Sequence, residues 1–222
     1  MSNPVLYYAC LTYASMVLHL NEGLDKSIHD QYQSKAIGYL IPLLSQHCVT
    51  GTDQTRLLAT AVILRMTEQY LDLDKDAQHH LRGAYSLFTT AQERWSPAMT
   101  DIKGVSFWIY IRESIRASFL REVGCQYDLD TVDPDCHSET HNDEVWTNRM
   151  TYLLARLCDA CWGDAGAEEK EAIKGRVSSS LGKWHANLPE TFQPWYFAKP
   201  ASQAFPVVKY VSSWHGKYPS PM

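Results

Sequence analysis

The sequence GVSFWIYIRESIRASF, residues 104–119, decides the fold class. Its apolar residues recur at spacings of three and four, the period of a helix with a buried face. The residues predicted to face inward are Val105, Trp108, Ile109, Arg112, Ile115, Arg116 and Phe119. The stretch therefore predicts a largely buried helix in which two guanidinium groups share an otherwise apolar face.

The same period continues on both sides of this stretch, and no alternating strand pattern of useful length interrupts it. It predicts helices over about 4–20, 25–43, 53–71, 74–88, 104–119, 144–162 and 168–187. We therefore expect an all-α fold, an irregular, solenoid-like array of about seven helices in one domain over residues 1–222. A polar stretch at about 128–143 predicts an acidic surface loop. A proline-rich tail over 188–222 is expected to be mostly extended, with at most a short helix around 207–214.

Composition narrows the class of protein. Of the 222 residues, 45% are hydrophobic and 20% are charged, which is usual for a folded domain. The net charge of -5 argues against direct nucleic-acid binding, because affinity for phosphates comes from clustered Lys and Arg. No apolar run approaches the ~20 residues that span a bilayer. The six scattered cysteines are typical of reduced thiols, so we expect an intracellular, cytoplasmic protein.

Four stretches resemble, in order, the fungal-specific transcription factor domain, the regulatory half of zinc-cluster transcription factors. They are LLATAVIL at 57–64 leading to HLRGA at 80–84, FWIYIRESI at 107–115, WTNRM at 146–150, and WHANLP at 184–189 continuing to Phe192. The resemblance covers most of the chain, about residues 5–215. It implies a helical, solenoid-like array of the kind found in regulators of fungal metabolism.

Two departures from that family bear on function. Its regulators read DNA with six closely spaced cysteines that hold two zinc ions, and no three cysteines here lie close enough. Family members also normally continue with more helices, whereas this chain passes into Gly216 and two prolines near its end. The chain is expected to be either a fragment of a regulator or a short stand-alone protein with an inherited fold, and we favour the second.

Six residues are candidates for a site in the interior. Arg112 can donate hydrogen bonds to a carbonyl or carboxylate of a ligand, or it can form a structural ion pair with Glu113, Glu68 or an aspartate of the loop. His80, which follows another histidine, is the second candidate donor, or a structural histidine. The candidate wall of an apolar pocket consists of Tyr8, Trp108, Tyr110 and Arg116, although core packing is the alternative for the aromatic rings.

The sequence gives no support for a cofactor or a resident metal. It has no dinucleotide or phosphate loop, no nucleophile elbow and no zinc-protease motif. Cys158 and Cys161 lie within one predicted helix and lack a second pair, so packing explains them better than zinc. The cluster Cys136, His137, Glu139 and His141 is predicted to be part of a solvated loop rather than a metal site.

Two functional hypotheses follow. The first is a stand-alone, cofactor-independent cyclase or pericyclase of the Diels–Alder type, acting on an apolar small molecule in fungal secondary metabolism. A shaped pocket lowers such a barrier by orienting the substrate, and one hydrogen-bond donor adds electrostatic stabilisation. The second is a ligand-sensing or dimerising regulatory domain, which would place the protein in the nucleus. No heptad repeat specifies an oligomer, so a homodimer is neither required nor excluded.

Overall fold

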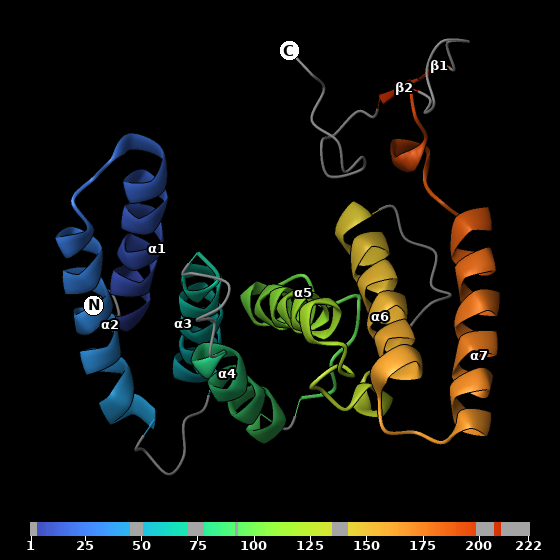
Figure 1. Ribbon diagram of the computed structural model, residues 1–222, viewed down its shortest axis with the longest axis horizontal. Helices are drawn as coiled ribbons and strands as arrows, with labels where there is room; N and C mark the ends of the chain where they lie inside the picture. Colours follow the sequence, from blue (N-terminus) through green and yellow to red (C-terminus); the bar gives the residue numbers. More distant parts are fainter. Residues whose placement is uncertain are drawn as a thin grey trace.

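The computed structural model describes residues 4–44, 51–70, 78–91, 93–134, 142–198 and 207–209. It confirms the all-α prediction (Figure 1). The helices of the described residues are α1 (Pro4–Glu22), α2 (Lys26–Leu44), α3 (Gly51–Glu68), α4 (His79–Thr90), α5 (Ile102–Arg121), α6 (Asp143–Trp162) and α7 (Ala167–Ala186). The short elements are the 3-10 turns η2 (Leu129–Thr131) and η3 (Glu190–Phe192), and the antiparallel strands β1 (Tyr196–Ala198) and β2 (Val207–Lys209).

The helices form an array in which each packs mainly against its neighbours in the chain. The α1–α2 hairpin lies at one end, α3 and α4 come next, α5 crosses the middle, and α6 and α7 form the other end (Figure 1). Helix α3 also contacts α1 and α5, so it links the hairpin to the centre. This arrangement fits the predicted irregular, solenoid-like array.

Local sequence signals set the helix ends. The Asp101 carboxylate accepts a hydrogen bond from Gly104 N at 2.8 Å and so caps α5. The Asn142 side chain caps α6 in the same way through Glu144 N, at 2.9 Å. Gly23, with φ +73, follows the end of α1 in the left-handed conformation that glycine adopts without strain.

The hydrophobic core has two parts. The larger part surrounds α5 and is dominated by aromatic rings, among which Trp95 stacks on Phe107 with centroids 4.5 Å apart. The smaller part lies between α1, α2 and α3 and consists of Val5, Ala9, Ala36, Leu40, Leu57 and Leu64. Helix α3 contributes to both parts, because Leu58 faces the larger cluster while Leu57 and Leu64 face the smaller one.

The predicted inward face of α5 is partly wrong. Val105 is 38% exposed and Phe119 is 55% exposed, whereas Phe107, Ile111 and Ser114 are fully buried. The reason is that α5 packs against α3 and α4 on one side and α6 on another, so the buried surface extends around much of the helix. Ser114 is buried against the loop after α5, where its hydroxyl accepts a hydrogen bond from Gln126 N at 3.0 Å. Hydrophobic spacing alone assigns a serine to the surface.

The acidic loop and the tail differ in detail from their predictions. Within 128–143, Leu129 is buried in η2 and Asp143 already belongs to α6, while 135–141 lie outside the described residues. In the tail, residues 207–209 form strand β2 rather than the start of a short helix, and residues 210–214 are not described. Tyr196 pairs with Lys209 across this small sheet.

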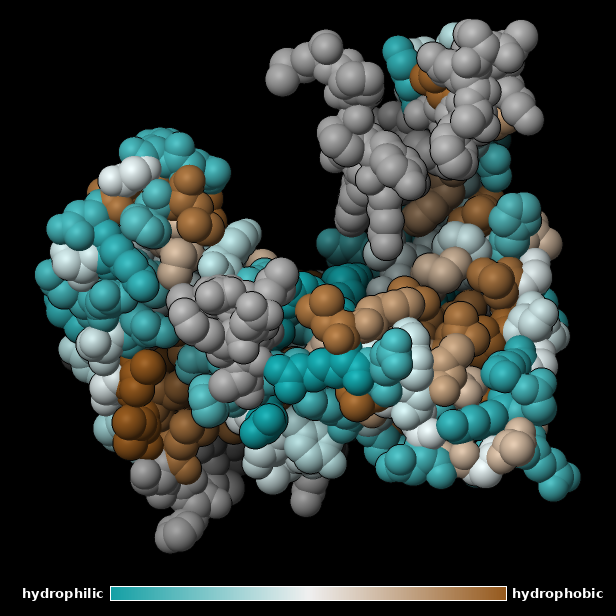
Figure 2. Space-filling model, in the orientation of Figure 1, coloured by the Kyte–Doolittle hydropathy of each residue, from teal (hydrophilic) through white to brown (hydrophobic). Residues whose placement is uncertain are grey.

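Apolar side chains also reach the surface. Figure 2 shows hydrophobic atoms over α6 and α7, where Leu157 and Leu181 are exposed. Among the described residues, no helix combines the length and apolar character needed to cross a membrane.

Candidate functional site

The structure places Arg112 at a contact between two helices. Its Nη2 donates to Asn148 Oδ1 on α6 at 2.8 Å, and Asn148 Nδ2 donates to the carbonyl of Pro97 at 3.1 Å. Part of the Arg112 side chain is exposed, but burial of the guanidinium lowers its pKa, an effect that Glu144 opposes. Arg112 therefore links α5 to α6, and Arg116 is half-buried one turn further along α5.

Glu68 and Glu113, two predicted alternatives for an ion pair with Arg112, pair instead with Arg65. Arg65 is 2% exposed, and its Nη1 lies 3.1 Å from Glu68 Oε2 while its Nε lies 3.3 Å from Glu113 Oε2. Sequence reasoning missed this buried ion network. The available signal was an arginine and a glutamate three positions apart, directly after the apolar run at 57–64, where an unpaired buried charge would be costly.

His80 lies beside this network. The backbone N–H groups of His79 and His80 donate to the Glu68 carboxylate at 2.8 and 3.2 Å, which holds the start of α4 against α3. Burial lowers the pKa of the half-buried His80 imidazole, although Glu68 partly opposes this shift. We therefore expect His80 to be neutral at pH 7 and to sit at a structural junction.

The predicted aromatic wall is not assembled in one place. Trp108 and Tyr110 are buried in the larger core, where Trp108 Nε1 donates to Ser96 O and Tyr110 stacks on Phe88 at 4.9 Å. Tyr8 packs instead with the smaller core and stacks on Tyr39 of α2 at 5.7 Å. The six predicted site residues are thus spread over the helix array rather than gathered around one cavity.

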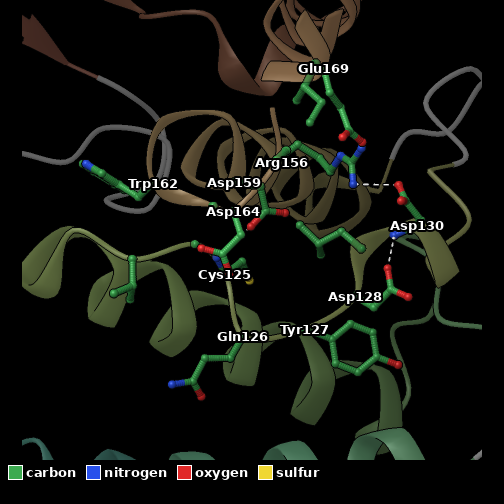
Figure 3. Close-up of a pocket in the computed structure, with 16 residues that line it drawn as sticks. Cys125, Gln126, Tyr127, Asp128, Asp130, Arg156, Asp159, Trp162, Asp164 and Glu169 are labelled. Carbon is green, nitrogen blue, oxygen red and sulfur yellow. Dashed lines mark hydrogen bonds and ion pairs between the residues drawn. The ribbon is translucent and has the colours of Figure 1, made fainter. Parts of the chain in front are cut away.

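A cavity of about 590 Å³ lies elsewhere, at the junction of α5, α6 and α7 (Figure 3). Its walls are residues 123–130 after α5, Arg156, Asp159 and Trp162 of α6, residues 163–165 between α6 and α7, and Glu169 and Ile173 of α7. Both connections that flank α6 therefore meet at this cavity. Its volume is within the range of small-molecule sites, roughly 300–1,000 Å³.

A close glycine contact joins the two connections beside the cavity. A Cβ atom placed on Gly124 would lie 2.9 Å from the Cα of Gly163, closer than real Cβ atoms approach. Next to this contact, Cys125 N donates to Asp159 Oδ1 at 2.7 Å, and Gly163 N donates to the Asp159 carbonyl at 2.8 Å. Asp159 therefore fastens the loop after α5 to the end of α6.

Charged groups line the cavity unevenly. Five carboxylates contribute to the lining, those of Asp128, Asp130, Asp159, Asp164 and Glu169, and the basic lining residue is Arg156. The Arg156 guanidinium is paired with Asp130 at 2.7 Å (Figure 3). Burial raises the pKa of the Asp159 carboxyl, a shift that its hydrogen bond from Cys125 and the charge of Arg156 only partly oppose.

The cysteines near the cavity are poorly suited to nucleophilic chemistry. Burial raises the pKa of the Cys125 thiol and raises that of Cys158 to about 12, so both are protonated at neutral pH. Cys158 is buried in the larger core whereas Cys161 is exposed, so the two thiols do not share one environment.

The structure offers no metal centre in the part of the chain that it describes. No group of three or more His, Cys, Asp or Glu side chains there is arranged to hold a metal ion. The cluster of Cys136, His137, Glu139 and His141 lies outside the described residues.

Fold and cavity together define the chain as an all-α helical array in which described residues form a wide, negatively charged hollow. Comparisons with protein families, with curated proteins and with solved structures find no match for the chain. The resemblance to the fungal-specific transcription factor domain therefore stays a prediction.

Proposed function

We propose that this protein binds a small organic molecule in the cavity between α5, α6 and α7, and that it acts as a ligand-sensing domain. The observation that carries the proposal is the cavity itself, which has a volume of about 590 Å³ and walls drawn from three successive parts of the fold. A hollow of this size holds a molecule of drug-like dimensions.

The position of the cavity favours sensing. Its walls include both connections that flank α6, and α7 contributes Glu169 and Ile173. A ligand that contacts all three parts would stabilise one placement of α7 relative to α5, because binding can only favour the arrangement with which it interacts best. The proposal keeps the regulatory hypothesis but places the binding site at residues that were not among the candidates predicted from the sequence.

A catalytic role is the second candidate, and Asp159 is the observation that favours it. A carboxyl group whose pKa is raised by burial can keep a proton closer to neutral pH and donate it to a bound substrate. A cofactor-independent cyclase would need such a donor beside an enclosed substrate. Under this hypothesis Asp159 takes the role that the sequence assigned to Arg112 or His80.

Binding is tested by ligand-observed NMR with a set of small organic compounds of positive, neutral and negative charge. In Ala165→Trp the indole ring should fill part of the cavity, because Ala165 lines it. Ala167→Trp is the matched control, since Ala167 is exposed on α7 outside the lining. We expect compounds that bind the wild type and Ala167→Trp but not Ala165→Trp. The proposal is wrong if no compound shows this pattern.

Sensing and catalysis are separated by following any compound that binds. A sensed ligand is recovered unchanged and slows hydrogen exchange in α7, whereas a substrate of the cyclase is converted to an isomer of the same mass. Conversion that survives in Asp159→Asn would remove the catalytic role of Asp159.

A further inference from the structure

The charges around the cavity indicate the kind of molecule that it takes. Resting on the proposed function, we infer that the ligand is a compact organic cation, an amine carried on an apolar or aromatic skeleton. The geometry that leads to this class is a hollow with carboxylates on several walls and apolar surface between them.

The cavity lining carries more negative than positive charge. Asp128, Asp159, Asp164 and Glu169 come from four different parts of the wall, and the lining guanidinium of Arg156 is already engaged by Asp130. An anionic ligand would enter a field of its own sign and would lack a free cationic partner in this lining. A cationic ligand would be attracted from several directions, because acidic residues lie on several walls of the hollow.

The cavity is suited to an organic cation rather than to a metal ion. Calcium and magnesium need several oxygen atoms converging at about 2.0–2.6 Å. The described residues contain no such group of acidic side chains, and the cavity is far larger than an ion. Its volume instead matches a molecule with a carbon skeleton.

Part of the cavity wall is apolar. Leu129 and Ile173 line the cavity from η2 and from α7, and Tyr127 also belongs to the lining. Such surface can cover the skeleton of an amine while the carboxylates hold its ammonium group. A purely polar cation, such as a bare ammonium ion, would leave this surface unused.

Asp159 is the carboxylate best placed to hold the ammonium group. One of its oxygens is fixed by the N–H of Cys125 at 2.7 Å, so the side chain is already oriented and loses little freedom on binding. Figure 3 shows Asp159 and Asp164 drawn together in the central part of the lining. Partial burial makes the Asp159 charge costly, and a bound cation would reduce that cost.

The test uses three probes that share an indole ring and differ in charge: tryptamine, tryptophol and indole-3-acetate. We expect tryptamine to bind at least about tenfold more tightly than the other two by isothermal titration calorimetry. We also expect its affinity to fall as salt rises from 150 to 500 mM, because ions screen the attraction. Loss of tryptamine binding in Ala165→Trp, with retention in Ala167→Trp, places the binding in the cavity.

Charge-removing variants sharpen the result. Asp159→Asn keeps an oxygen for the N–H of Cys125 and should weaken tryptamine binding roughly three- to tenfold. Asp128→Asn is the second variant, because an asparagine oxygen can still accept from Asp130 N. Glu171→Gln is the control with the same change in net charge on an exposed residue outside the lining. It should leave the affinity unchanged.

The outcomes distinguish this inference from the proposed function. Cavity binding of tryptophol or indole-3-acetate as tight as that of tryptamine overturns the cationic class and leaves a binding cavity. Equal loss of affinity in Glu171→Gln and Asp159→Asn also overturns it, because only overall charge would then matter. If none of the three probes binds in a way that Ala165→Trp abolishes, this inference fails, while the NMR screen still decides whether the cavity binds anything.

Discussion

Replacing Arg65 by methionine tests the buried ion network. In the native protein this guanidinium lies 3.1 Å from a Glu68 oxygen and 3.3 Å from a Glu113 oxygen. Methionine keeps much of the length and apolar volume of the side chain but removes the charge. Two carboxylates would then remain at the α3–α5 contact without the cation that lies between them.

The expected loss follows from the burial of these groups. Breaking a buried ion pair by removing one partner costs about 3–5 kcal/mol, because the other charge is left without compensation. The Glu68 side chain is 7% exposed but keeps two backbone N–H donors, and that of Glu113 is 12% exposed. We therefore take the lower half of the range, about 3–4 kcal/mol. That is a large fraction of the roughly 5–15 kcal/mol that stabilises a domain.

The measurement is urea unfolding followed by far-UV circular dichroism. We expect the midpoint to fall while the slope with denaturant stays the same, as for a change in stability alone. Arg56→Met is the matched control on the same helix, because Arg56 pairs with Asp53 at 3.0 Å on the surface. That loss should stay below about 1 kcal/mol.

A double variant checks that the cost arises from the network. Arg65→Met and Glu113→Gln combined should destabilise by less than the sum of the single changes, since each removes part of the same interaction. Equal losses for Arg65→Met and Arg56→Met would refute the reasoning, and so would strictly additive losses in the double variant.

Three further predictions concern Gly124, Asp159 and Arg112. Gly124→Ala should destabilise the protein by about 1–3 kcal/mol in urea unfolding, because the new Cβ meets backbone atoms. Gly175→Ala is the control with open space around it, and it should stabilise the protein by up to about 1 kcal/mol. Equal effects of the two changes would contradict the close glycine contact. Because burial raises the pKa of Asp159, its charged form is disfavoured in the folded state, so its contribution to stability falls as pH rises from its ordinary pKa through the folded one. Asp159→Asn should therefore match or exceed the wild type at pH 7 and lose that advantage below about pH 4, and a marked loss at pH 7 would show that the carboxylate charge is stabilising. Arg112→Ala should cost about 1 kcal/mol by loss of the hydrogen bond to Asn148; an unchanged midpoint would show that this contact contributes little.

The fold class could be predicted because helix signals are local. The spacing of apolar residues and the side chains at helix ends act within a few positions of one another. Asp101 caps α5 through a residue three positions away, and Gly23 ends α1 by its own conformation. The structure begins α5 two residues before the predicted start and places α6 and α7 within one residue of their predicted bounds.

The candidate site could not be predicted in the same way. The cavity depends on Gly124 meeting Gly163, two residues in separate connections with no periodic pattern around them. Helical spacing also does not say which helices meet, so Tyr8 and Trp108 could be assigned to one wall although they pack in different cores. Partner choice was hidden for the same reason, since Glu113 pairs with Arg65 of another helix rather than with Arg112 beside it.

Helix α3 belongs to both parts of the core, and this determines how the protein can partly unfold. Its residues 57–62 are all buried, because one side packs on the α1–α2 hairpin and the other on the core around α5. The hairpin can detach by giving up the smaller cluster alone, while release of α3 would disrupt both. Native-state hydrogen exchange should therefore differ between the two helices. Amides of α2 should exchange through a low-energy partial unfolding, whereas those of α3 should exchange only on global unfolding.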